Sequence, residues 1–179
     1  MTEWNRNHDP SIADILARRY LPQFWRTSRA LLGCPDLAED VAQDAMVKLL
    51  HALERFDGRA AFRTWSYTIL INTVRNELRR QRTGGKHLEE GFDVANSARI
   101  APVDERLLTA EARRVVDEAL QRLTEKQRSA FVLMVLEGLQ ASEVAELEGC
   151  SVDAVYQRVT DARKLLRQDV SLNQLVQTK

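Results

Sequence analysis

The sequence predicts an all-α protein of two small helical domains joined by a flexible linker, with a helix-turn-helix in the second domain. Apolar residues recur at helical spacing on both sides of the linker. Glycine, asparagine, serine and proline gather in residues 84–107, and a structureless stretch of about 20 residues inside one compact domain would be unusual. We therefore place the first domain at 1–83, the linker at 84–107, the second domain at 108–170 and a tail at 171–179.

The composition is that of an ordinary globular protein. The chain has 179 residues, 44% of them hydrophobic, and its 26 basic and 26 acidic side chains balance. Charged residues near the N-terminus exclude a signal-peptide pattern, and the longest uncharged run, residues 64–74, is too short to span a bilayer. We therefore expect a cytoplasmic protein without membrane insertion. Neutral charge does not exclude nucleic-acid binding, since affinity depends on where the positive charge lies.

The sequence shows no spacing of residues that is typical of a catalytic or metal site. Cys34 and Cys150 lie far apart without a CxxC pattern, and the three histidines are scattered. No nucleophile–base pairing or glycine-rich phosphate loop is present. The sequence therefore predicts no catalytic residues, no metal site and no cofactor.

The first domain begins with two predicted helices and an acidic one. Residues 11–32 show helical spacing that we expect to break near Pro22, because proline disfavours helix in the residue before it. Asp36 is the predicted N-cap of the next helix, with Glu39 in the capping-box position. The first turns of that helix carry acids and no base. They either complement the helix dipole or form an acidic docking face for a basic partner.

The helix expected over residues 61–82 has two distinct faces. It lies in a stretch, residues 55–82, with seven arginines against two acids, a local net charge of about +5. One face is an apolar core stripe: Tyr67, Leu70, Ile71, Val74 and Leu78. The other mixes an aromatic ring and isoleucine with amides and arginines: Trp65, Thr68, Ile69, Asn72, Arg75, Asn76 and Arg79. That mixture suits unpaired nucleic acid, although a helix buried on two sides, with arginines reaching to water, would look similar.

The second domain opens with a helix over about residues 104–123, followed by a Thr124–Gln127 capping box. The helix expected from 128 to 137 carries the apolar run AFVLMVL, which predicts the buried centre of this domain, and Gly138 ends it.

A helix-turn-helix follows, with helices over residues 141–148 and from 152 onward. Ser151 is the predicted N-cap of the second helix. Four side chains are expected to point inward: Val155, Val159, Ala162 and Leu166. Five are expected to point outward: Asp153, Tyr156, Gln157, Thr160 and Lys164. Polar groups at the start of a second helix fit major-groove reading, but the same spacing occurs in bundles that do not bind DNA.

Four stretches together resemble a known family: DLAEDVAQDAM (36–46), RFDGRAAFRTWSYTILINTVRNELRR (55–80), LTEKQRSAFVLMVLEGL (123–139) and SEVAELEGCSVDAVYQRVTDARKLLR (142–167). Their order and spacing resemble the extracytoplasmic-function sigma factors, the small two-domain members of the bacterial sigma-70 family. The pairing of F-x-x-W-x-x-x-I-x-x-N with a distant helix-turn-helix is specific. The resemblance implies a sigma factor, not an enzyme, that binds core RNA polymerase and directs promoter-specific initiation.

The resemblance also implies roles for residues of the first domain. Asp40, Gln43 and Asp44 match the surface that docks on the coiled coil of the largest polymerase subunit. The turn at 56–63 resembles the loop that captures a flipped base of the −10 element, and Asn72 matches the base-pocket asparagine. The full set matched to −10 DNA is Phe56, Arg59, Arg63, Trp65, Asn72, Arg75, Asn76 and Arg79.

For the rest of the chain, the resemblance implies a linker near the RNA exit path and a second domain on the flap of the second-largest subunit. That domain would read the −35 element as duplex. The set matched to −35 DNA is Ser151, Asp153, Ala154, Tyr156, Gln157, Arg158 and Arg163. An inhibitory anti-sigma factor is a common partner in the family.

The chain departs from the family pattern in the recognition helix and just before the turn. The recognition helix reads DAVYQR (153–158) where GTVKSR is frequent, Tyr156 replaces a common lysine, and Glu148 stands where an apolar residue is usual. These departures bear on the −35 sequence more than on the fold. The alternative to a sigma factor is a stand-alone helix-turn-helix repressor whose first domain binds a ligand or dimerises.

Overall fold

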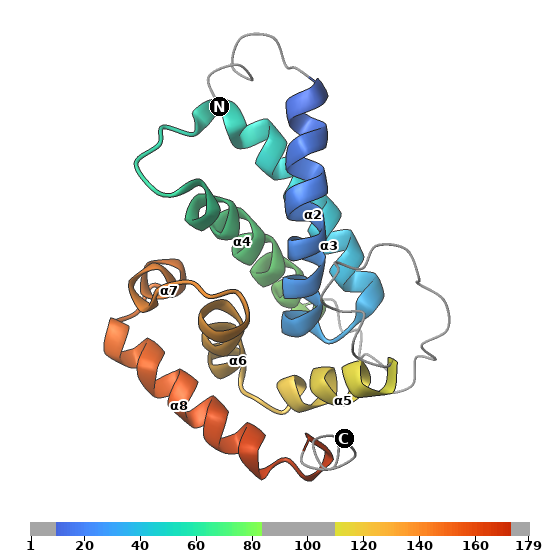
Figure 1. Cartoon of the computed structure of the whole chain (residues 1–179), viewed down its shortest axis with the longest axis vertical. Coiled ribbons are helices and arrows are strands. Elements are labelled where there is room, and N and C mark those ends of the chain that lie inside the picture. Colours follow the sequence, from blue (N-terminus) through green and yellow to red (C-terminus); the bar gives the residue numbers. More distant parts are fainter. Residues whose placement is uncertain (1–9, 84–109, 173–179) are drawn as a thin grey trace.

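The computed structural model describes residues 10–83 and 110–172, which form helices and turns without a strand (Figure 1). The first half contains α2 (Pro10–Leu32), α3 (Pro35–Ala52), the 3-10 turn η1 (Leu53–Arg55) and α4 (Phe62–Thr83). The second half contains α5 (Ala110–Gln121), α6 (Glu125–Phe131), the π turn η3 (Val132–Leu136), α7 (Ala141–Glu148) and α8 (Val152–Gln168). The predicted all-α class is confirmed, while the predicted linker lies outside the described residues.

A single helix, α2, replaces the two short helices predicted around Pro22, so that prediction is wrong. Proline removes one backbone donor from a helix interior. Tertiary packing on both sides outweighs this loss. Tyr20 and Phe24 are 7% and 0% exposed, with ring centroids 6.0 Å apart, and Phe24 meets Tyr67 of α4 at 6.2 Å.

The start of α3 also differs from the prediction. Cys34, not Asp36, is the N-cap, and its side chain makes no capping hydrogen bond. Pro35 occupies the first helical position, where its missing N–H leaves no backbone partner unsatisfied. The helix therefore begins two residues earlier than a capping box at Asp36 would require. Its apolar stripe, including Ala45 and Leu49 at 0% exposure, faces α2 and α4 as expected.

The second half follows the predicted signals closely. The Thr124–Gln127 capping box is present, Gly149 ends α7 in the left-handed conformation, and Ser151 caps α8 by accepting from the Ala154 N–H at 3.2 Å. The apolar run is only partly buried, because the chain winds into η3. Val132 and Leu133 are 0% exposed, whereas the last two apolar residues of η3 reach solvent.

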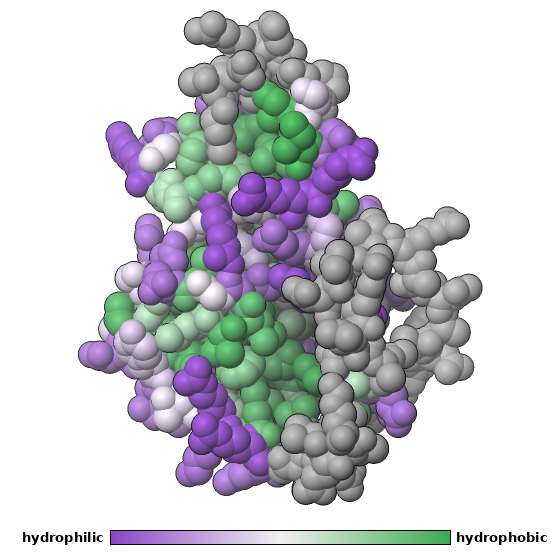
Figure 2. Space-filling model, viewed as in Figure 1, coloured by the Kyte–Doolittle hydropathy of each residue, from purple (hydrophilic) through white to green (hydrophobic). Residues whose placement is uncertain are grey.

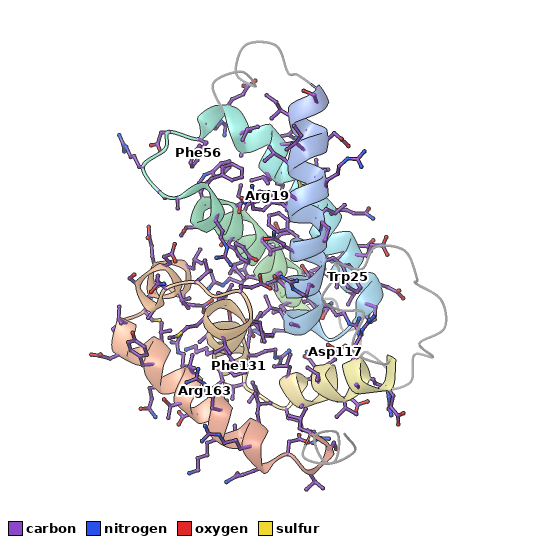
Figure 3. All side chains as sticks on the ribbon, in the orientation of Figure 1. Arg19, Trp25, Phe56, Asp117, Phe131 and Arg163 are labelled. Carbon is purple, nitrogen blue, oxygen red and sulfur yellow. The ribbon has the colours of Figure 1, made fainter. Side chains whose placement is uncertain are left out.

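The two halves pack directly against each other. Figure 1 shows α6 and α7 beside α4, with α5 below the end of α2. Between the halves, α4 contacts α7, and α2 contacts α5 and α6. Buried residues from both halves form one contiguous apolar cluster. At one edge of this contact Arg29 of α2 lies over the Trp25 ring and binds Asp117 of α5 at 2.6 Å. Figure 3 labels Trp25 and Asp117 at this edge.

Gly33 packs closely against Gln121 of α5, so a side chain at this position is expected to destabilise the protein. Its φ is +74°, and a Cβ there would lie 2.5 Å from Cδ of Gln121 on α5. Gly33→Ala is expected to lower the free energy of unfolding by about 1–2 kcal/mol through the backbone alone, and further because the Gln121 side chain must move. Gly58→Ala is the matched control, since φ is +76° there but nothing lies within 4 Å of the added carbon. Urea unfolding of both variants checks this, and equal losses would contradict the contact with Gln121.

Candidate polymerase and nucleic-acid surfaces

The acidic face of α3 is exposed along its length. Asp40, Gln43 and Asp44 all face solvent. Asp44 binds Lys48 at 2.7 Å and Gln43 donates to Glu39 at 3.2 Å, both within the helix. The three residues matched to polymerase docking therefore share one accessible side of α3.

The turn before α4 is held by an aromatic cluster. Phe56 points from the turn toward the start of α4 (Figure 3), with its ring 5.3 Å from that of Phe62 and 4.9 Å from that of Trp65. Arg59 stays exposed at the tip, 3.2 Å from Asp57. Phe56 and Trp65 are thus half-buried parts of one apolar support, whereas Arg59 projects to solvent.

The polar face of α4 separates into two groups. Asn72, Asn76 and Arg79 are exposed, and Arg79 donates to the Asn76 side-chain oxygen at 3.0 Å. Arg63, which is also exposed, and Arg75, which is half-buried, contact the second half. Arg63 donates to the Glu137 carbonyl, and Arg75 donates to the Leu147 carbonyl at 3.0 Å. The structure therefore brings one part of the predicted −10 set to solvent and the other part to the boundary between the halves.

The start of α8 presents most of the predicted −35 set. Asp153, Tyr156 and Gln157 are exposed, with Tyr156 at 51%. Arg163 is exposed farther along the helix, and Ala154 is half-buried. The Ser151 hydroxyl is already engaged as the helix cap, so it is less available to DNA than the other members.

Arg158 does not join the exposed set. Its guanidinium lies inside the turn, 3.3 Å from the Cys150 sulfur and 4.0 Å from Glu148, and its side chain is 20% exposed. Glu148 also accepts from Ser129 at 2.7 Å and binds Arg75 at 2.9 Å. These polar partners explain how a glutamate is accommodated at a position where an apolar residue was expected.

Sequence reasoning missed Glu137. Its carboxylate, 2% exposed, accepts from Thr27 at 2.9 Å and from the Tyr67 hydroxyl at 2.5 Å. Burial, together with this carboxylate, raises the pKa of Tyr67 above its ordinary value, so the phenol stays protonated and donates. A charged residue at the end of an otherwise apolar run, directly before Gly138, was the signal that pointed to a buried contact.

Among residues 10–83 and 110–172, no group of three or more histidine, cysteine or acidic side chains could hold a metal ion. In the same residues, no helix is both long and apolar enough to cross a membrane.

Comparisons with known proteins match both halves of the chain. The family model described as Sigma-70 region 2 matches residues 16–83, and Sigma-70, region 4 matches residues 113–166. The ECF RNA polymerase sigma-E factor of Haemophilus influenzae is 31% identical over 138 residues, covering 73% of each chain. The RNA polymerase sigma-H factor of Pseudomonas aeruginosa is 34% identical over 165 residues, covering 88% of this chain and 86% of the relative.

A solved structure has the same fold. The sigma factor RpoE of Bartonella quintana, crystallised with the anti-sigma factor NepR, superposes with a TM-score of 0.71 at 23% identity, covering 89% of this chain and 96% of that one. The two helical halves, their order and the sequence relatives agree. The chain belongs to the extracytoplasmic-function group of the sigma-70 family, the DNA-binding factors that act with RNA polymerase in transcription initiation.

Proposed function

We propose that this sigma factor binds core RNA polymerase through α3, reads the −35 element as duplex through α8, and captures the −10 element as melted strand through α4 and the turn before it. The single observation that carries the proposal is the exposed pair Asn72 and Asn76 on α4, next to an arginine-rich turn built on aromatic rings. Amides can pair with base edges, and arginines bind phosphate.

For the −10 element, the exposed amides select a base and the arginines hold the strand. Arg59 and Arg79 are exposed and supply the phosphate contacts. Phe56 and Trp65 support the turn and give the captured base an apolar wall. Extracting a base from the duplex costs roughly a few kcal/mol. Binding the unstacked base offsets part of this cost, and the duplex melts as a result.

For the −35 element, the N-terminal end of α8 enters the major groove. Asp153, Tyr156 and Gln157 are the exposed side chains in position to contact base edges, and Arg163 is placed for a phosphate. Arg158 acts instead within the turn, where it supports the helix-turn-helix through Glu148.

The remaining assignments concern protein partners. Asp40, Gln43 and Asp44 dock on the largest polymerase subunit, and the second half rests on the second-largest. An anti-sigma factor is a further partner, since RpoE of Bartonella quintana was crystallised with one and shares this fold.

The docking assignment predicts weaker polymerase binding when the acids are neutralised. Asp40→Asn with Asp44→Asn is expected to weaken core binding about tenfold, or about 1.4 kcal/mol, because complementary charge is lost. Folding should change by less than about 0.5 kcal/mol, since both residues are exposed. Asp14→Asn on α2 is the matched control for loss of an exposed acid. Anisotropy of labelled protein titrated with core polymerase measures both, and equal effects would refute the assignment.

The whole proposal is tested by run-off transcription with core polymerase and a genomic promoter library. Selective transcripts that share −35 and −10 sequences are the expected result. Tight duplex binding without polymerase, with no transcripts, would instead support the stand-alone repressor.

A further inference from the structure

Three polar side chains follow one line along the exposed side of α8. Asp153, Gln157 and Asp161 are four residues apart, and side chains at that spacing are neighbours on a helix. The buried residues Val155 and Val159 lie on the opposite side. Hydrophilic side chains lie along the outer edge of the molecule where α8 runs (Figure 2). The line is therefore directed away from the rest of the protein, on the side of α8 that reads DNA under the proposed function.

Gln157 and Asp161 are joined by a hydrogen bond. The amide nitrogen of Gln157, whose side chain is exposed, donates to the Asp161 carboxylate at 3.1 Å. A glutamine amide has two N–H donors and a carbonyl acceptor, so one N–H and the carbonyl stay available. Because the bond restricts the rotation of a flexible side chain, less conformational freedom is left to lose when the amide binds a base.

The groups that Gln157 keeps available match adenine. In the major groove adenine presents the N7 acceptor beside the N6 amino donor, and a glutamine amide binds both at once. Guanine presents two acceptors there, N7 and O6, so one of them would face the Gln157 carbonyl. The Asp161 carboxylate adds a negative charge next to the same amide, which disfavours the guanine edge further. Adenine is therefore the base that this pair of side chains accepts.

The arginine next to Gln157 does not reach the same bases. Arg158 follows Gln157 directly in the sequence, but its guanidinium lies inside the turn, 3.3 Å from the Cys150 sulfur, and its side chain is 20% exposed. Lys164 is seven residues beyond Gln157, about 10 Å along the helix. Arginine and lysine are the usual readers of guanine. Their placement leaves the Gln157 amide and the carboxylates beside it to face the bases.

We propose that Asp161 is a positioning residue that holds Gln157 for one adenine of the −35 element, and that the charge of Asp161 excludes guanine at that base pair. Asp161 lies outside the set of residues matched to −35 DNA, and it acts through Gln157 without contacting a base itself. The inference rests on the proposed function, which places the N-terminal end of α8 in the major groove. It adds the base that one residue of α8 selects and the residue that orients it.

The test compares holoenzymes, each made of core polymerase and this protein or a variant, on a promoter library with a randomised −35 element. A barcode in the transcribed region identifies each promoter, so sequencing the transcripts gives the base preference at every −35 position. The variants are Gln157→Glu, Asp161→Ala and Asp161→Asn. Glu118→Ala is the matched control, since Glu118 is an exposed acid of α5 that accepts from Arg114, four residues away, at 2.9 Å.

In the unsubstituted holoenzyme, one −35 position is expected to favour adenine over guanine about tenfold. Gln157→Glu should change that position alone to cytosine, because a glutamate accepts from the cytosine N4 amino group and cannot donate to adenine N7. Asp161→Ala should lower the ratio of adenine to guanine there about threefold or more, since both the hydrogen bond and the charge are lost. Glu118→Ala should leave every position unchanged.

Asp161→Asn separates the hydrogen bond from the charge. Its amide carbonyl still accepts from Gln157, so adenine should stay preferred over the pyrimidines. The negative charge is gone, so discrimination against guanine should fall. If Asp161→Ala does not fold, guanine discrimination by Asp161→Asn equal to that of the unsubstituted protein would overturn the proposal.

An unchanged base profile with Asp161→Ala would overturn the positioning role, and an unchanged profile with Gln157→Glu would overturn the assignment of adenine to Gln157. An equal fall in transcription from every −35 sequence would also overturn the positioning role, because a purely structural residue changes output and not base preference. A shared −35 sequence that none of these variants alters refutes this inference alone. Transcripts from the unsubstituted holoenzyme that share no −35 sequence would refute the proposed function together with it.

Discussion

Replacing Asn72 with alanine is expected to lower open-complex formation about tenfold or more while core polymerase binding stays near normal. The side chain is exposed on α4, and a well-placed pair of hydrogen bonds to a base is worth about 1–3 kcal/mol of discrimination. Removing it takes away the contact that keeps a flipped base out of the duplex. Permanganate reactivity of the melted strand, measured beside anisotropy with core polymerase, checks both halves of this expectation.

Thr68→Ala is the matched control for Asn72→Ala. Thr68 lies one turn earlier on the same face, is exposed, and donates to the Thr64 carbonyl at 3.1 Å. Its hydroxyl is thus satisfied within the helix, and its loss is expected to change melting by less than about twofold. A loss of core binding by Asn72→Ala would show that the residue has a structural role, and unchanged melting would remove it from the −10 site.

Trp65 is the residue whose interpretation the structure changes most. From spacing alone it belongs to a face that suits either unpaired nucleic acid or a helix buried on two sides. In the structure its ring packs 4.9 Å from Phe56 and 5.5 Å from Phe62, and it is half-buried. Trp65→Ala is therefore expected to weaken melting by loosening the turn, with some loss of stability, and not only by removing a stacking surface.

The sequence predicts a helix correctly wherever the capping residues and the apolar spacing nearby favour the same helix that tertiary packing stabilises. The apolar stripe of α4 and the Ser151 cap of α8 both follow from residues close together in the sequence. The start of α3 was misjudged because Pro35 begins a helix as readily as Asp36 caps one. Residue preferences at helix starts do not decide between two such residues when they are adjacent in the sequence.

The contacts between the halves could not be predicted from the sequence. Arg63 and Glu137 are 74 positions apart, and Arg26 and Glu137 are 111 apart. Hydrophobic periodicity assigns each residue to a face but says nothing about which distant face will cover it. A two-domain prediction therefore does not show which residues of the two halves contact each other.

Phe24 tests the claim that packing carries α2 through Pro22. Phe24→Ala is expected to lower the free energy of unfolding by about 3–5 kcal/mol, a large part of the roughly 5–15 kcal/mol available to a domain. Phe24 is fully buried two residues after the proline and contacts both Tyr20 and Tyr67. Ile15→Ala, at a residue 62% exposed on the same helix, should change stability by less than about 0.5 kcal/mol.

Urea unfolding followed by circular dichroism compares the two variants directly. Helical signal lost in Phe24→Ala before the global transition would show that α2 frays at the proline once its anchor is removed. A loss below about 1 kcal/mol would mean that the helix is continuous for local reasons. That outcome would contradict the explanation given for Pro22, because proline in a helix interior costs about 3 kcal/mol and needs a compensating contact nearby.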